Sequence, residues 1–220
     1  MRDWAPALAA EAIGTFLFFF IAAGAALVAT GDPAETLLIV ALAHGLVLAV
    51  LVSSLGAVSG AHFNPAVTLG LWVAGKIDAA KGVAYVVAQL IGAVAAGFAL
   101  AWCFGDVGPA VPALGQGVDV FTGMALEAIM TVVLLLAVFG TAVDPRGPRL
   151  GGLAIGLAVA ADILLGGTLT GAAMNPARWF GPALAAGTFD NWYVWWIGPF
   201  VGAILVALLY RYLFAPPAED

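Results

Sequence analysis

The sequence predicts an all-α membrane protein with six transmembrane helices and two half-helices, arranged as an inverted repeat of three spans. Three observations support this fold class. The 220-residue chain is 64% hydrophobic and 9% charged, with a mean hydropathy of +1.09, which lies outside the composition of soluble domains. The tripeptide Asn-Pro-Ala occurs twice, 111 positions apart. Each half carries three long apolar runs, so the second half must enter the membrane from the opposite side.

The apolar runs have the length that a membrane span requires, which is about 20 residues of helix. The first run is expected to be a true span, because no cleavable signal pattern precedes it. The length suits one channel domain over 1–220, with repeat one at 1–104, a Gly- and Pro-rich linking loop at 105–119, and repeat two at 120–220. The six expected spans are 6–29, 36–56, 82–104, 120–140, 150–165 and 192–214.

Sequence matches outside the tripeptides also relate the two halves. The first span of each half opens on Glu-Ala-Ile-x-Thr, beginning at Glu11 and at Glu127. The last span of each half carries a Gly-Ala pair, beginning at Gly92 and at Gly202. These matches make the repeat a property of the whole chain.

Each Asn-Pro pair is a helix-start signal, because Asn caps a helix and Pro suits its first position. About ten residues follow before the next glycine, which is roughly 15 Å of helix and about half of a bilayer core. We therefore expect two half-helices whose starts meet near the middle of the membrane. The two motifs are Asn64, Pro65, Ala66 and Asn175, Pro176, Ala177.

Irregular backbone at membrane depth is tolerated only where it is buried in protein or lines a wet cavity. Both loops therefore predict a pore. A helix N-terminus carries about half a positive charge, and the amides of Asn64 and Asn175 can donate hydrogen bonds into the lumen. Such a collar opposes cations and protons while neutral molecules pass. The sequence thus predicts a passive channel for water and small neutral solutes.

The segments FNPAVT and MNPARWFG, the two Glu-Ala-Ile-x-Thr starts and the six-span repeat resemble the aquaporin (major intrinsic protein) family over nearly the whole chain. The resemblance implies a right-handed bundle of six spans and two half-helices, and a homotetramer with one pore in each subunit. We expect a bacterial-type water channel.

Arg178 is the only charged residue within either expected half-helix, and a charge inside a membrane segment indicates function. It resembles the filter arginine of aquaporins. The family's spacing carries the other filter positions over to His44, Ile163 and Ala172. This set is similar to that of several plant tonoplast intrinsic proteins, which pass ammonia as well as water. His44 is expected to offer solutes a polar group. The alternatives are a strict water channel, in which Trp179 or a loop fills the filter, and a weak glycerol or urea facilitator.

Four further polar residues need an explanation. The resemblance implies that Glu11 and Glu127 support the loop backbones by accepting hydrogen bonds. His62 resembles a conduction-path histidine, although a simple loop contact explains it equally well. Asp162 stands in an apolar run and needs donors. It could brace the loop after the fifth span or lie near Arg178.

Two other classes of function were weighed. An ion-coupled transporter also uses broken helices, but it needs a charge relay within the membrane. A scaffold with a vestigial pore would not need two intact motifs and Arg178. We expect no catalytic residues, metal or cofactor, and the net charge of −6 argues against a nucleic-acid partner. The expected partners are water, small neutral solutes and the lipid bilayer.

The basic residues predict the orientation. Six of the seven fall on the side that holds the N-terminus, so the positive-inside rule places both termini in the cytoplasm. We expect an integral protein of the plasma (inner) membrane. The six residues are Arg2, Lys76, Lys81, Arg146, Arg149 and Arg211.

Overall fold

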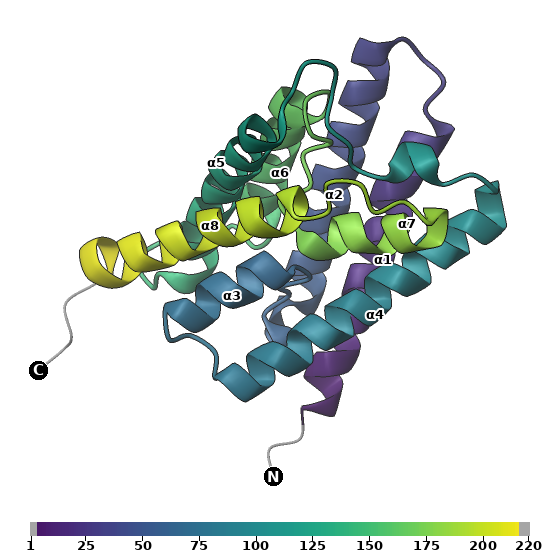
Figure 1. Cartoon of the computed structure of the whole chain (residues 1–220). Helices are drawn as coiled ribbons and strands as arrows, with labels where there is room; N and C mark the ends of the chain where they lie inside the picture. The colour runs from purple at the N-terminus through teal and green to yellow at the C-terminus, as the bar shows by residue number, and fades with distance from the viewer. Residues whose placement is uncertain (1–3, 216–220) are drawn as a thin grey trace, which may run out of the picture.

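The computed structural model describes residues 4–215 as a bundle of helices (Figure 1). Five of the helical segments are long and apolar enough to cross a membrane. The elements in chain order are α1 (Ala5–Val28), α2 (Pro33–Ser59), α3 (Pro65–Val73), α4 (Ala79–Phe104), η1 (Gly108–Ala110), α5 (Val120–Val138), η2 (Phe139–Val143), α6 (Leu153–Gly166), α7 (Pro176–Ala186), α8 (Val194–Leu209) and η3 (Tyr210–Phe214).

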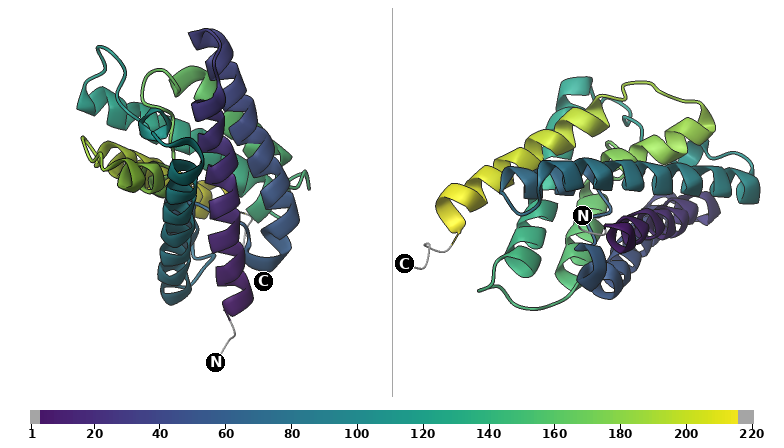
Figure 2. Two further views of the ribbon diagram at one scale, coloured as in Figure 1. Left: turned by 90° about the vertical axis from the view of Figure 1, so that its right-hand side faces the viewer. Right: turned by 90° about the horizontal axis from the view of Figure 1, so that it is seen from below.

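The packing of the helices shows the inverted repeat. In the first half α1 packs on α2 and α4, and in the second half α5 packs on α6 and α8. Figure 2 shows α1 lying between α4 and α2. Each half-helix packs on the last span of the other half, with α3 against α8 and α7 against α4 (Figure 1). The predicted fold class is confirmed.

The two half-helices have the predicted length, but one full span does not. Helix α3 has nine residues and α7 has eleven. The fifth span, expected at 150–165, is the 14-residue α6, which is about 21 Å long. Gly151 turns the chain at a φ of +57°, which delays the helix start, and the helix ends at Gly166. The prediction of six runs of about 20 residues was therefore wrong for this helix.

Glycines let the paired spans approach closely in both halves. A Cβ on Gly92 in α4 would collide with the carbonyl oxygen of Ala12 in α1. A Cβ on Gly202 in α8 would collide with the carbonyl oxygen of Ala128 in α5. In lipid, where tails are as apolar as side chains, such close packing is a main source of helix association. The repeated Gly-Ala pair therefore fixes the same helix contact twice.

The basic side chains tie together the loops at one end of the bundle. Arg146 pairs with the carboxylate of Asp144 at 2.6 Å and also donates to the carbonyl of Phe214 in η3. Hydrogen bonds from Arg146 lower the pKa of Asp144 to about 2. Arg211 donates to the carbonyl of Val73 at the end of α3, at 3.2 Å. Arg2, which the orientation argument also used, lies outside the described residues.

Candidate pore and selectivity filter

The two Asn-Pro pairs start their half-helices in the same way. Asn64 and Asn175 have extended backbones with φ of −156° and −155°, and a proline follows each. The Oδ1 of Asn64 accepts from the N–H of Ala66 at 2.8 Å, and the Oδ1 of Asn175 accepts from the N–H of Ala177 at 3.0 Å. Each side-chain oxygen is therefore used within its own half-helix, which leaves the amide nitrogen free to turn elsewhere.

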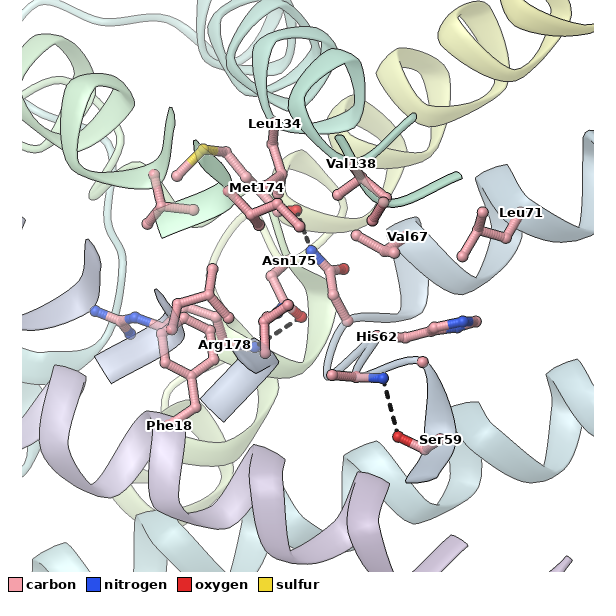
Figure 3. Close-up of a pocket in the computed structure, with 18 of the residues that line it drawn as sticks. Phe18, Ser59, His62, Val67, Leu71, Leu134, Val138, Met174, Asn175 and Arg178 are labelled. Atoms are coloured by element: carbon pink, nitrogen blue, oxygen red, sulfur yellow. Dashed lines mark hydrogen bonds between the residues drawn. The ribbon is translucent and has the colours of Figure 1, made fainter. Parts of the chain in front are cut away.

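The two amides cross over between the halves. The Nδ2 of Asn64 donates to the carbonyl of Met174 at 2.9 Å, and the Nδ2 of Asn175 donates to the carbonyl of Phe63 at 3.0 Å. An amide nitrogen carries two hydrogens, so each asparagine keeps one N–H beyond this crossing. Both asparagines line the same cavity, in which Figure 3 shows Asn175. The two remaining donors can therefore meet a molecule there.

The loops that lead into the half-helices carry matching backbone strain. Ala61 and Phe63 have φ of +50° and +48°, and Ala172 and Met174 have φ of +43° and +52°. The two pairs are 111 positions apart, as the asparagines are. Non-glycine residues in this region cost on the order of 1–3 kcal/mol each. Other contacts must therefore hold both loops in place.

Glu127 holds the second loop. Its carboxylate is fully buried and accepts from the hydroxyl of Thr170 at 2.6 Å, from the N–H of Ala173 at 3.0 Å and from the N–H of Met174 at 2.6 Å. The hydroxyl of Thr170 in turn accepts from the N–H of Ala172 at 3.1 Å. One carboxylate thus satisfies three donors beside the strained residues.

Glu11 holds the first loop with one donor more. It accepts from the hydroxyl of Ser59 at 2.6 Å, and from the N–H groups of His62 and Phe63 at 2.9 Å and 2.8 Å. The side-chain amide of Gln89 in α4 adds a fourth bond at 2.7 Å. Sequence analysis did not identify Gln89, which has no counterpart around Glu127.

A cavity of about 330 Å³ passes both asparagines. In Figure 3, Asn175 lies between Arg178 on one side and His62 on the other. The wall of the cavity is mostly aliphatic, with polar groups at few places. Aliphatic residues of the wall include Val67, Leu71, Leu134, Val138, Ile155 and Val159. A polar molecule in this cavity therefore depends on the asparagine donors and on the groups near each end.

Arg178 is 5% exposed and is fixed by two bonds in the filter region. Its Nε donates to the Nε2 of His44 at 3.1 Å, and its Nη1 donates to the carbonyl of Ala110 at 2.8 Å. The Nδ1 of His44 donates to the carbonyl of Val40 at 2.8 Å. These bonds assign the His44 proton to Nδ1. Both ring nitrogens are therefore occupied, and the expectation that His44 offers solutes a free polar group is corrected. His44 instead orients Arg178.

The other expected filter positions differ in where they lie. Ala172 lines the cavity together with His44 and Arg178. Ile163 is 1% exposed and is not part of the cavity wall over residues 4–215. Trp179 stacks on Trp195 with ring centroids 5.6 Å apart and planes 7° apart, and neither ring is part of the cavity wall over the described residues. The filling of the filter by Trp179, which the strict-channel alternative invoked, is therefore not what the structure has.

His62 lines the cavity, and its role in conduction stays a prediction. Its Nδ1 lies 3.0 Å from the hydroxyl of Thr68. Asp162 is 4% exposed, and its Oδ2 has no hydrogen-bond partner among the residues that the structure describes. The contacts of this carboxylate do not show it bracing the loop or pairing with Arg178.

Two aromatic residues bond to the loop backbones from the last span of each half, and sequence analysis predicted neither contact. Tyr85 in α4 donates to the carbonyl of Ser59 at 2.7 Å, and Trp195 in α8 donates to the carbonyl of Thr170 at 2.9 Å. They stand 110 positions apart, the same offset as Gly92 and Gly202. Extending the repeat alignment along the last span of each half would have found them.

Comparison with known proteins identifies the protein family to which the chain is similar. The major intrinsic protein family model matches residues 2–210. Aquaporin TIP4-4 of Zea mays is 47% identical over 94% of this chain and 86% of its own length. The probable aquaporin TIP3-2 of Arabidopsis thaliana is 40% identical over 96% of this chain and 84% of its own. The solved structure of the aquaglyceroporin from Plasmodium falciparum shares the fold, with a TM-score of 0.83, 24% identity, and coverage of 96% of this chain and 97% of the other.

The chain belongs to the major intrinsic protein family. It is an integral membrane protein and a water channel of the aquaporin kind, not an enzyme. The relatives named above at 40% identity or more are plant proteins, so the bacterial-type assignment has no support from them.

Proposed function

We propose that the pore conducts ammonia beside water and excludes protons and ions. The observation that carries this proposal is the filter region, where Arg178 shares the cavity wall with an alanine rather than with a bulky side chain. Ala172 lines the cavity there, and His44 is fully engaged by Val40 and Arg178. A guanidinium has five N–H donors, and two of these are committed to protein groups. The donors that remain suit any small neutral molecule with a lone pair.

The proposed filter consists of His44, Ala172 and Arg178, with Ile163 packed behind the wall. Resemblance to plant aquaporins of the TIP type, with which this chain is 40–47% identical, supports the conduction of water. Protons and cations are opposed by three features: the positive ends of α3 and α7, the two asparagine donors between them, and the charge of Arg178. The alternatives are a strict water channel and a weak glycerol or urea facilitator.

Stopped-flow measurements on proteoliposomes test this proposal. Water flux is measured by osmotic shrinkage, and ammonia entry by the rise of internal pH, each against protein-free vesicles of the same lipid. We expect both fluxes to exceed the protein-free rate. Fast water flux with only background ammonia flux would reject the proposal and leave the strict water channel. Glycerol and urea shrinkage assays on the same vesicles measure the remaining alternative.

We also propose a homotetramer, both termini on the cytoplasmic side, and location in the plasma membrane. The tetramer rests on the resemblance to the family, and we place its contacts at the exposed apolar side chains of α2 and α6, which include Leu42, Leu46 and Leu157. The orientation is supported by the basic loops and η3 at one end of the bundle. Native mass spectrometry in mild detergent tests the assembly. Protease access to an N-terminal tag in sealed cells tests the orientation. Fluorescence microscopy of a tagged chain shows in which cellular membrane the protein is located.

A further inference from the structure

A second cavity, of about 280 Å³, lies on the outer side of the half-helix α3, between α4 and α8. It is separate from the pore, which runs along the other side of α3. Trp72 is 49% exposed at this groove, so the groove opens on the outside of the bundle. The wall is almost wholly apolar. Lining residues include Thr68, Leu69 and Trp72 of α3, Gly82 and Val86 of α4, and Phe200 of α8.

The one hydroxyl in this list is already satisfied within the protein. The Oγ1 of Thr68 donates to the carbonyl of Asn64 at 3.1 Å and accepts from the side-chain amide of Gln89 at 3.0 Å. A molecule in the groove therefore does not need to form a hydrogen bond with this hydroxyl. The groove presents methyl groups, methylenes and aromatic rings to whatever lies in it.

The repeat places larger side chains at two equivalent positions of the second half. The positions equivalent to Leu69 and Val86 are Phe180 and Trp196, at offsets of 111 and 110. These two rings meet edge to face in the second half, with centroids 6.3 Å apart. At these two positions large aromatic side chains occupy the outer side of α7, whereas the smaller Leu69 and Val86 line an open groove on the outer side of α3.

The size and position of the groove fit one leaflet of a bilayer. Its α4 wall runs from Ala79 to Val87, which is about 12 Å of helix, and one leaflet of the hydrocarbon core is about 15 Å deep. At the end of α3 that leads to the basic loops, Arg211 donates to the carbonyl of Val73, the residue after Trp72. The guanidinium is exposed there, with further donors to offer.

We propose that this groove binds one acyl chain of an anionic phospholipid, with the lipid phosphate at Arg211. The chain enters from the leaflet on the side of the basic loops. Lipid tails surround the protein everywhere in the membrane. The hydrophobic effect therefore contributes nothing to the preference of an acyl chain for this groove, because the chain does not leave water when it binds. The preference comes from dispersion contacts in a hollow that would otherwise lack them, and from the attraction between the guanidinium and the phosphate.

Native mass spectrometry of the purified channel, titrated with phosphatidylglycerol or phosphatidylcholine, tests the proposal. Gly82→Leu fills the groove without a backbone collision, because a Cβ there meets only the methyl of Thr68 at 3.7 Å. Gly56→Leu in α2 is the matched control, since a Cβ there meets nothing within 4 Å. We expect one tightly held phosphatidylglycerol in each wild-type subunit, at least ten-fold weaker binding in Gly82→Leu, and wild-type binding in Gly56→Leu.

Val86→Trp is the second variant for the groove, because it places the indole that position 196 carries in the other half. It should lose the lipid as Gly82→Leu does while keeping wild-type water flux, which shows that the protein is folded. Arg211→Gln should lower the preference for phosphatidylglycerol over phosphatidylcholine by about five-fold. Equal affinity of the wild type for both lipids, or unchanged lipid occupancy in the folded groove variants, would overturn the proposal.

Discussion

The two halves of the channel are alike in their backbone and unlike in the side chains that follow the asparagines. Ala61 and Phe63 share their left-handed backbone with Ala172 and Met174, 111 positions later. A buried glutamate supports each loop. After the shared Asn-Pro-Ala, however, the first half continues with Val67 and Thr68 and the second with Arg178 and Trp179.

This difference shows how one repeat yields a directional pore. Val67 adds to the apolar wall, whereas the equivalent Arg178 is the charged residue of the proposed filter. Thr68 contacts His62 in the cavity wall, whereas the equivalent Trp179 stacks on Trp195 outside it. The repeated residues build the scaffold, and the residues that differ place a filter at one end and a vestibule with a histidine at the other.

The largest expected effect follows from removing either glutamate. Glu127→Ala leaves three buried donors unpaired, at roughly 1–3 kcal/mol for each group. Glu11→Ala leaves four donors unpaired, of which two are buried and two are partly buried. We expect folded yield by size-exclusion chromatography to collapse in both variants, and more so for Glu11→Ala. The Glu→Gln variants keep one carboxamide oxygen as an acceptor, so their folded yield should fall less than that of the alanine variants. Normal yield with an altered ratio of solute fluxes would contradict the structural role.

Cysteine substitutions at the equivalent alanines separate the two ends of the pore. The wild type should be insensitive to mercurials at the filter, because Ala172 stands there and Cys103 is the one thiol of the chain. On a Cys103→Ser background, a mercurial should remove most of the water flux of Ala172→Cys and of Ala61→Cys. Both positions line the cavity, so a mercury atom bound there obstructs it. A membrane-impermeant reagent should block them from opposite sides. Block of both from the same side would rule out this arrangement.

His44→Phe tests the filter at a smaller scale. The substitution removes the acceptor for the Nε of Arg178 and adds bulk beside it. We expect ammonia flux to fall several-fold relative to water flux, which narrows the solute range. His44→Gln keeps an oxygen acceptor for Arg178 and is the control for bulk. An unchanged ratio of ammonia to water flux in His44→Phe would mean that His44 does not shape the filter.

The smallest expected effect concerns the exposed pair of Asp144 and Arg146. The pKa of Asp144 is lowered from 3.8 to about 2, so its contribution to stability is present above pH 4 and is lost as the pH falls through about 2. Exposed ion pairs contribute little, so the difference in melting temperature between wild type and Asp144→Asn should be small at pH 6. It should vanish near pH 2. A difference that grows on acidification would have the wrong sign.

The sequence predicted the fold and the two half-helices that begin at the asparagine motifs, because each feature occurs in both halves of the repeat. It did not predict the partner of His44, because that contact depends on how α2, α7 and the loop carrying Ala110 meet in space. It overestimated the fifth span, since hydropathy continues through the turn at Gly151 that delays α6. The contacts of Asp162 could not be predicted for the same reason. A buried carboxylate needs donors, but the residues around it come from other helices, and the sequence does not say which.

The most direct test of the division between the halves is the flux of protons and cations through Arg178→Val. This substitution gives the second half the residue that the first half has at the equivalent position. We expect the wild type and Val67→Ala to keep proton and potassium fluxes at the level of protein-free vesicles. Arg178→Val should retain water flux and raise ion flux well above that level. Ion flux that stays at background in a folded, water-conducting Arg178→Val channel would contradict the account.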